Sequence, residues 1–182
     1  QSLNKITDNE VDLVRFRAYH KWDFTLRFIE KIEKDSTRIY TSGKGMKPWN
    51  PMQKGGRIVF ENYAAALDTV GEWFLNNNGI LYYIPLPGET PENTEVVAPR
   101  LGHLIRIKGN AIEENFVENI QFEGISFTHC HYRMPKTGSE PNQAAALINA
   151  AIMLEGVKNI NFTNCEISKT GQHALWFGKG CS

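Results

Sequence analysis

The feature that most constrains the fold is an internal repeat in the second half of the chain. Residues 119–127 resemble residues 159–167, with apolar side chains at matching positions: Ile120 and Ile160, Phe122 and Phe162, Ile125 and Cys165, Phe127 and Ile167. Residues 104–109 resemble 151–156, and residues 174–180 give a third version about 24 positions later. Short repeats of alternating apolar residues without a long helix indicate a stacked solenoid, and they favour a parallel β-helix over a leucine-rich repeat.

Alternation within each repeat predicts which side chains point inward. We expect a stacked interior made of eight residues: Ile105, Ile107, Ile120, Phe122, Ile152, Leu154, Ile160 and Phe162. Cys165 takes an inward position and is interpreted as a buried free thiol. Trp176 and Phe177 are adjacent, so only one of them can face in, and the pattern leaves open which. Because a solenoid buries its faces only by stacking, we expect further coils after Ser182 and regard the chain as a fragment.

The first half, residues 1–100, has a different texture. Residues 72–75 and 80–84 predict a hairpin around Asn78-Gly79, a pair suited to a tight turn. Residues 14–19 and 25–32 are further strand candidates. Residues 62–68 are expected to form helical turns with Asn62 as N-cap. The expected fold is all-β, with a β-sandwich-like insert over residues 1–100 and coils of a right-handed parallel β-helix over residues 101–182.

Charge and cysteine content exclude several classes of protein. Lys plus Arg is 20 and Asp plus Glu is 20, so the 182-residue chain has no net charge and lacks the basic excess of a nucleic-acid binder. Its apolar runs are too short for a transmembrane helix. Three cysteines without a CxxC pair support neither a disulfide scaffold nor structural zinc. We expect no metal and no cofactor, since His129 and His131, which flank Cys130, have no third ligand in view.

Several segments occur in an order that resembles a known family: Phe16 to Trp22, Gly45 to Pro51, Glu61 to Tyr63, Gly71 to Leu75, Leu81 to Pro85 and Val117 to Phe127. The chain resembles, over most of its length, the β-helix glycosidases of glycoside hydrolase family 141, and more distantly family 120. The resemblance implies a right-handed parallel β-helix interrupted by an insert. It implies hydrolysis of plant cell-wall glycosides such as xylosides or fucosides by an extracellular or periplasmic protein.

No residue of this chain matches a catalytic motif of that family. We therefore leave the catalytic carboxylates unknown, expect them on coils after Ser182, and expect residues 1–182 alone to be inactive. Glu123, Glu155 and Glu166 on the repeat are interpreted as surface charges.

Six residues are candidates for binding an oligosaccharide or polysaccharide. Aromatic rings stack on the C–H faces of sugars, which points to Trp22 and Trp176, with Trp49 as a further possibility. His20, beside Trp22, can donate a hydrogen bond to a sugar. Glu61 follows the apolar run 57–60 and can accept from a sugar hydroxyl or cap the next turn, with Asn62 beside it. His173 lies where a coil edge would line a groove.

Two alternatives stay open. The first is a non-catalytic β-helix that binds carbohydrate or mediates adhesion; two outward carboxylates on adjacent coils would distinguish an enzyme from it. The second is a polysaccharide lyase, which would use Ca²⁺ and a Lys or Arg base against uronates, and against which the balanced charge argues mildly.

Overall fold

The computed structural model describes residues 3–35, 38–48, 50–140 and 148–182, so the candidate Trp49 lies outside the described residues. The chain is all-β: in these ranges it forms β-strands and three short 3-10 helices, with no α-helix. It divides into two compact units. Unit 1 comprises Gln1–Glu95 and Met134–Ala146, and unit 2 comprises Val96–Arg133 and Leu147–Ser182. The return of residues 134–146 to unit 1 was not anticipated from the sequence.

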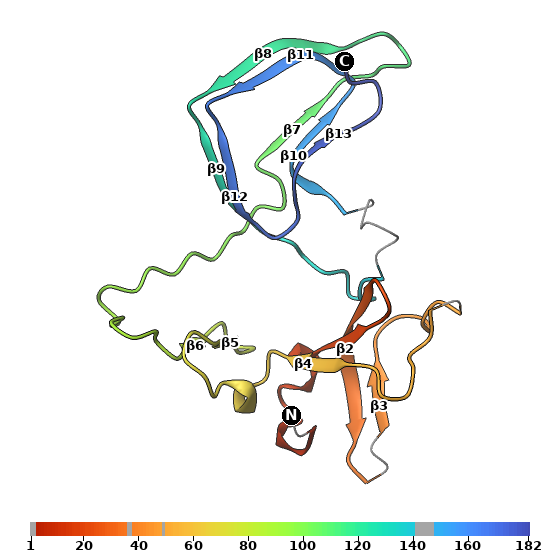
Figure 1. Cartoon of the computed structure of the whole chain (residues 1–182), viewed down its shortest axis with the longest axis vertical. Helices are drawn as coiled ribbons and strands as arrows, with labels where there is room; N and C mark the ends of the chain where they lie inside the picture. Colours follow the sequence, from red (N-terminus) through yellow and green to blue (C-terminus); the bar gives the residue numbers. More distant parts are fainter. Residues whose placement is uncertain (1–2, 36–37, 49, 141–147) are drawn as a thin grey trace. The chain divides into compact units, whose positions relative to one another are not determined.

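Unit 1 is built on one antiparallel sheet of four strands in the order β3-β2-β1-β4 (Figure 1). The strands are β1 (Arg15–Tyr19), β2 (Phe24–Glu33), β3 (Arg38–Thr41) and β4 (Ile58–Glu61). A separate hairpin pairs β5 (Trp73–Leu75) with β6 (Leu81–Tyr83). The 3-10 helices are η1 (Leu3–Lys5), η2 (Val11–Leu13) and η3 (Ala64–Ala66). The hairpin is a second, two-stranded sheet, and the expected sandwich-like arrangement of residues 1–100 stays a prediction.

The hairpin around Asn78-Gly79 is confirmed. Gly79 has a φ of +77°, the left-handed conformation that glycine adopts without strain. The side-chain oxygen of Asn76 accepts hydrogen bonds from the N–H groups of Asn78 and Ile80, both at 2.9 Å. The turn is therefore fixed by local chemistry, which is why the sequence reveals it.

Alternation along the strands separates a buried from a half-exposed face of the four-stranded sheet. Phe16 and Ala18 are buried on β1, and with Ile29 of β2 they form the core of unit 1. Arg17 and Tyr19 point to the opposite, half-exposed face. Ile6, Val14 and Tyr63 complete the core on the buried side.

Asn62 does not cap a helical turn, so that prediction is wrong. The N-cap residue of the short helix η3 is Tyr63, and its side chain makes no capping hydrogen bond. Asn62 instead adopts a φ of +65°, and its side-chain amide donates to the carbonyl of Leu13 at 3.2 Å. The N–H of Ala64 is satisfied by Glu10, which comes from a distant part of the sequence.

Unit 2 contains three small parallel sheets, which Figure 1 shows as three sides of a coil. One turn of the chain supplies β7 (Ile105–Lys108), β8 (Val117–Glu123) and β9 (Ser126–Cys130). The next turn supplies β10 (Ala150–Glu155), β11 (Val157–Thr163) and β12 (Glu166–Thr170), followed by β13 (His173–Phe177). The sheets are ordered β13-β10-β7, β11-β8 and β12-β9.

The register of these sheets confirms the internal repeat residue by residue. Ile152 pairs with Ile105, Ile160 with Ile120, Phe162 with Phe122, and Ile167 with Phe127. The rings of Phe122 and Phe162 stack with centroids 4.9 Å apart. Ile152 and Leu154 are fully buried at the centre of the core of unit 2.

The third repeat pairs at a spacing of 23 rather than 24, because Leu175 lies opposite Ile152 and Trp176 opposite Met153. A shift of one residue would move each side chain to the other face of the sheet. The pairing answers the question that the sequence left open: Phe177, opposite Leu154, has the inward register, and Trp176 has the outward register.

Left-handed backbone positions also repeat, inside β8 and β11 and again just after these strands. Asn119 and Asn159 have φ angles of +61° and +51°, and Asn159 Nδ2 donates to Asn119 Oδ1 at 2.7 Å. Gly124 and Asn164 share the left-handed conformation at the bend that follows. Asparagine tolerates this conformation better than most residues do, which explains its place at these positions.

All three cysteines are free. Cys130 is buried, whereas Cys165 and Cys181 are half-buried, so the interpretation of Cys165 as fully buried is corrected. Its Sγ lies 3.5 Å from the carbonyl oxygen of Phe122, beside the core. None of the helices in the described ranges has the length and apolarity needed to cross a membrane.

Candidate functional site

A groove of about 390 Å³ runs beside the edge strand β4 in unit 1. This volume falls in the range of pockets that hold small ligands. The groove contains two of the residues expected to bind sugar, Glu61 and Asn62. Glu72 and Trp73 line it from the start of the β5–β6 hairpin.

Glu61 ends β4 and is held by an ion pair. Its Oε1 lies 2.9 Å from Nη2 of Arg17 on the neighbouring strand, and about a third of each side chain is exposed (32% and 31%). The guanidinium of Arg17 also lies over the ring of Phe24, 5.3 Å from its centroid. These contacts give the carboxylate a fixed position and leave part of it accessible from the groove.

Trp73 is an exposed aromatic residue in the lining of the groove. Its exposed fraction is 62%, whereas its neighbour Phe74 is buried. Phe74 stacks against Tyr82 on the opposite face of the hairpin, so the strand alternation presents Trp73 to solvent. Sequence reasoning placed Trp73 in a hairpin strand but did not select it as a site residue, because exposure depends on what the hairpin packs against.

The side chain of Glu72 bonds to the backbone of the turn just before it. Its Oε2 accepts hydrogen bonds from the backbone N–H groups of Asp68 and Thr69, at 2.9 and 3.0 Å. The carboxylate therefore fixes the loop that leads into β5. Glu72 also contributes a second carboxylate to the lining of the groove, besides that of Glu61.

His20 and Trp22 lie on the turn between β1 and β2. His20 Nε2 lies 2.8 Å from the Thr25 hydroxyl, and Trp22 is 69% exposed. Arg15, at the start of β1, pairs with Glu61, while His20 follows the other end of β1. The candidates His20 and Trp22 thus lie at the opposite end of β1 from the candidates Glu61 and Asn62.

His173 and Trp176 belong to β13 in unit 2, three residues apart, and therefore point to opposite faces of the strand. Trp176 is 38% exposed and continues an outward row with Arg106 and Met153. A Cβ on Gly178 would lie 2.8 Å from the Trp176 ring, so glycine is needed there. His173 is exposed and stands opposite Ala150.

A larger groove of about 710 Å³ lies beside the other face of the hairpin, lined by Phe74 and Tyr82. Its polar groups are mostly engaged: Asn76 bonds within its turn, and the Asn77 amide donates to the carbonyl of Asn9. This groove offers an aromatic wall, but it contains none of the six residues that the sequence singles out for sugar binding.

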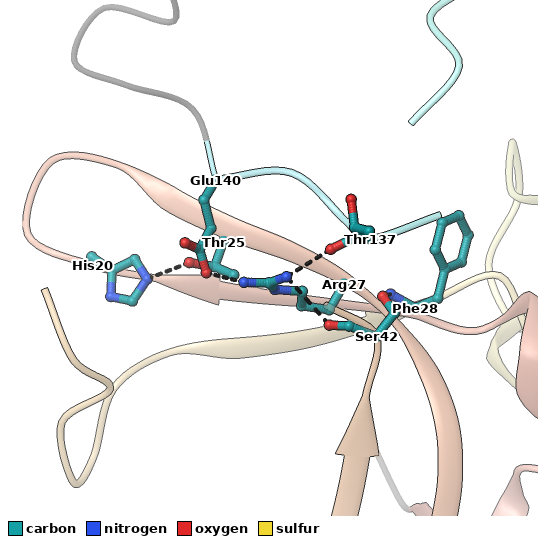
Figure 2. A network of polar contacts seen from close by, with 7 residues as sticks. All are labelled: His20, Thr25, Arg27, Phe28, Ser42, Thr137 and Glu140. Carbon is teal, nitrogen blue, oxygen red and sulfur yellow. Dashed lines mark hydrogen bonds and ion pairs between the residues drawn. The ribbon is translucent and has the colours of Figure 1, made fainter. Parts of the chain in front are cut away.

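A buried polar network that the sequence did not reveal surrounds Arg27 (Figure 2). The side chain of Arg27 is only 7% exposed and forms an ion pair with Glu140. It donates to the carbonyl oxygens of Thr137 at 2.6 Å and Ser42 at 3.3 Å. The network fastens residues 137–140 to β2, and its saturated contacts indicate a structural role.

The described residues contain no group of three or more His, Cys, Asp or Glu side chains suited to a metal ion. No family model matches the chain, and comparisons with curated proteins and with solved structures give no match.

Proposed function

We propose that this chain is the carbohydrate-binding part of an exported glycoside hydrolase that acts on plant cell-wall glycosides of the xyloside or fucoside type. One observation carries the binding role: the groove that places the exposed indole of Trp73 near the fixed carboxylate of Glu61. An aromatic face packs on the C–H groups of a sugar, and a carboxylate accepts hydrogen bonds from its hydroxyls.

Unit 2 supports the assignment to the β-helix class. Its strands recur in parallel pairs on three sides, as expected of a right-handed parallel β-helix. The resemblance to glycoside hydrolase family 141 points to the same architecture. Because one fold hosts many functions, this support rests on analogy, and the binding role itself rests on the groove.

The carboxylates of the groove are assigned to binding and not to proton transfer. A glycosidase needs a pair of carboxyl groups, one of which is kept protonated as the general acid. Glu61 is paired with Arg17, and Glu72 accepts two backbone N–H bonds, so both carboxylates are already engaged in fixed contacts. Glu155 on the coils likewise faces Lys108 at 3.5 Å. We propose that residues 1–182 bind sugar without hydrolysing it.

Calorimetric titration with xylotriose tests the binding role. Replacing Trp73 with Ala should weaken binding about fivefold, since stacking on an aromatic ring contributes about 1 kcal/mol. Tyr40→Ala is the matched control, because Tyr40 is an exposed aromatic (44%) on β3, at the opposite edge of the sheet from β4. Equal losses in the two variants, or no binding by the unaltered chain to xylotriose or a fucosylated trisaccharide, would contradict the proposal.

A non-catalytic binding module is the second candidate, favoured by the engagement of Glu61 and Glu72 in fixed contacts. Aryl xylosides and fucosides separate the two candidates when given to residues 1–182 and to a longer chain containing them. Release of nitrophenol only by the longer chain supports the hydrolase. Release by residues 1–182 would overturn the assignment of Glu61 and Glu72 to binding alone.

A further inference from the structure

The half-exposed face of the four-stranded sheet carries three arginines. Alternation places Arg15 and Arg17 of β1 on this face, and the register of β4 places Arg57, just before its first residue, on the same side. Tyr19 and Phe24 lie among them, paired across β1 and β2. The opposite face of the sheet is the one that packs on the core of unit 1.

Two of these arginines are stacked on aromatic rings. The guanidinium carbon of Arg57 lies 4.9 Å from the Tyr19 centroid, and that of Arg17 lies 6.0 Å from it. A stacked guanidinium uses its flat face for the contact and keeps its N–H edges for hydrogen bonds. The stacking therefore restricts Arg57 in a geometry that suits a planar, bidentate anion.

The face has more cations than anions. Glu61 pairs with Arg17, whereas no carboxylate of the described residues forms an ion pair with Arg15 or Arg57. Arg15 and Arg57 are both exposed. The surplus is local, since the whole chain has no net charge. A positively charged, aromatic surface is complementary to a ligand that has both a carboxylate and a flat apolar face.

This surface continues into the groove described above. Val59 and Glu61 share the face with Arg57, and both also line the groove. Arg57 precedes Glu61 by four residues, roughly 13 Å along a strand. A ligand that lies along β4 and reaches from Trp73 to Arg57 must therefore span more than one sugar unit.

We propose that this face selects acidic glycans: Arg57 and Arg15 bind uronate carboxylates of an oligosaccharide whose neighbouring unit occupies the Glu61–Trp73 groove. The inference rests on the proposed carbohydrate-binding function and names the class of ligand. It distinguishes an acidic polysaccharide from a neutral one of the same length.

Calorimetric titrations with trigalacturonate and with xylotriose, at one pH and ionic strength, test the preference. We expect trigalacturonate to bind on the order of tenfold more tightly, and Arg57→Gln to abolish most of this difference. Arg38→Gln is the matched control, because it removes one exposed positive charge from β3. An equal loss in both variants would show a nonspecific charge effect and overturn the inference.

The two proposals fail in different ways. Xylotriose binding that depends on Trp73, together with no gain for trigalacturonate, would refute the acidic preference and leave the proposed function standing. Absence of binding to both trisaccharides and to the fucosylated one would refute both. Trp73-dependent binding of xylotriose, together with tighter trigalacturonate binding that Arg57→Gln weakens and Arg38→Gln does not, would support both.

Discussion

A single buried carboxylate, Glu10, joins two segments of unit 1, one around Thr7 and one at Ala64. The residue is 7% exposed, and its oxygens accept hydrogen bonds from the N–H and hydroxyl of Thr7 and from the N–H of Ala64, each at 2.9 Å. Burial by itself raises the pKa of this carboxyl group. The hydrogen bonds from Ala64 and Thr7 outweigh burial, so the pKa of Glu10 is lowered overall.

The lowered pKa of Glu10 sets a pH dependence of stability. A carboxylate whose pKa is depressed by folding stabilises the folded state above its unfolded pKa, and this contribution is lost as pH falls through the folded value. Glu10→Gln should lower the free energy of unfolding by about 1–3 kcal/mol at pH 7. The difference from the unaltered chain should shrink below about pH 4.

Urea unfolding of the unaltered chain and of Glu10→Gln, at pH 7 and at pH 3, measures the difference in their free energies of unfolding. Asp8→Asn serves as the control, because the Asp8 side chain is almost fully exposed (98%) and faces Lys34 at 3.8 Å. The role given to Glu10 would be refuted by a loss that is equal at the two pH values or equal in the two variants.

At the scale of elements, the segment 137–140 is joined by backbone hydrogen bonds to an edge of β2. Leu26 and Ser139 exchange two backbone hydrogen bonds, at 2.9 and 2.8 Å. Gly138 has a φ of +81°, and a Cβ there would lie 2.4 Å from the carbonyl oxygen of Leu26. The pairing therefore depends on a glycine as well as on the Arg27–Glu140 ion pair.

Breaking this ion pair should release the segment. Glu140→Gln leaves Arg27 buried without its counter-charge, which costs about 3–5 kcal/mol. We expect faster amide hydrogen exchange at Ser139 and Leu26, measured by NMR, and little change at Gly79 in the hairpin. Lys136→Gln, which alters one exposed charge in the same stretch, should leave these rates unchanged. If amide exchange at Ser139 were unchanged in Glu140→Gln, the ion pair would not be what holds this segment to β2.

Elements with a local or periodic signal were predicted, whereas contacts between distant segments were not. The Asn78-Gly79 turn and the pairing of Ile160 with Ile120 follow from turn chemistry and from alternation. The Arg27–Glu140 pair joins positions separated by 113 residues, and no periodic pattern encodes such a contact. The groove at Glu61 and Trp73 falls between these cases: Glu61 was selected from its place after a strand, but the exposure of Trp73 depends on packing.

At the scale of the whole molecule, the chain forms two separate hydrophobic cores. The core of unit 1 is centred on Val14, Phe16 and Ile29, and the core of unit 2 on Ile152 and Leu154. The chain leaves unit 2 after Arg133 and re-enters it at Leu147. Because stability is distributed over cooperative units, each core should govern exchange in its own unit.

Leu154→Ala tests this independence. Leu154 is completely buried, so truncation should destabilise unit 2 by about 2–5 kcal/mol, and slowly exchanging amides of β10 and β11 should become faster by the corresponding factor. Amides of β1 and β2 in unit 1 should keep their rates. Met153→Ala, at the adjacent outward position, is the control and should have a much smaller effect. If Leu154→Ala accelerated exchange equally in β1 and β10, the two cores would unfold together as one cooperative unit.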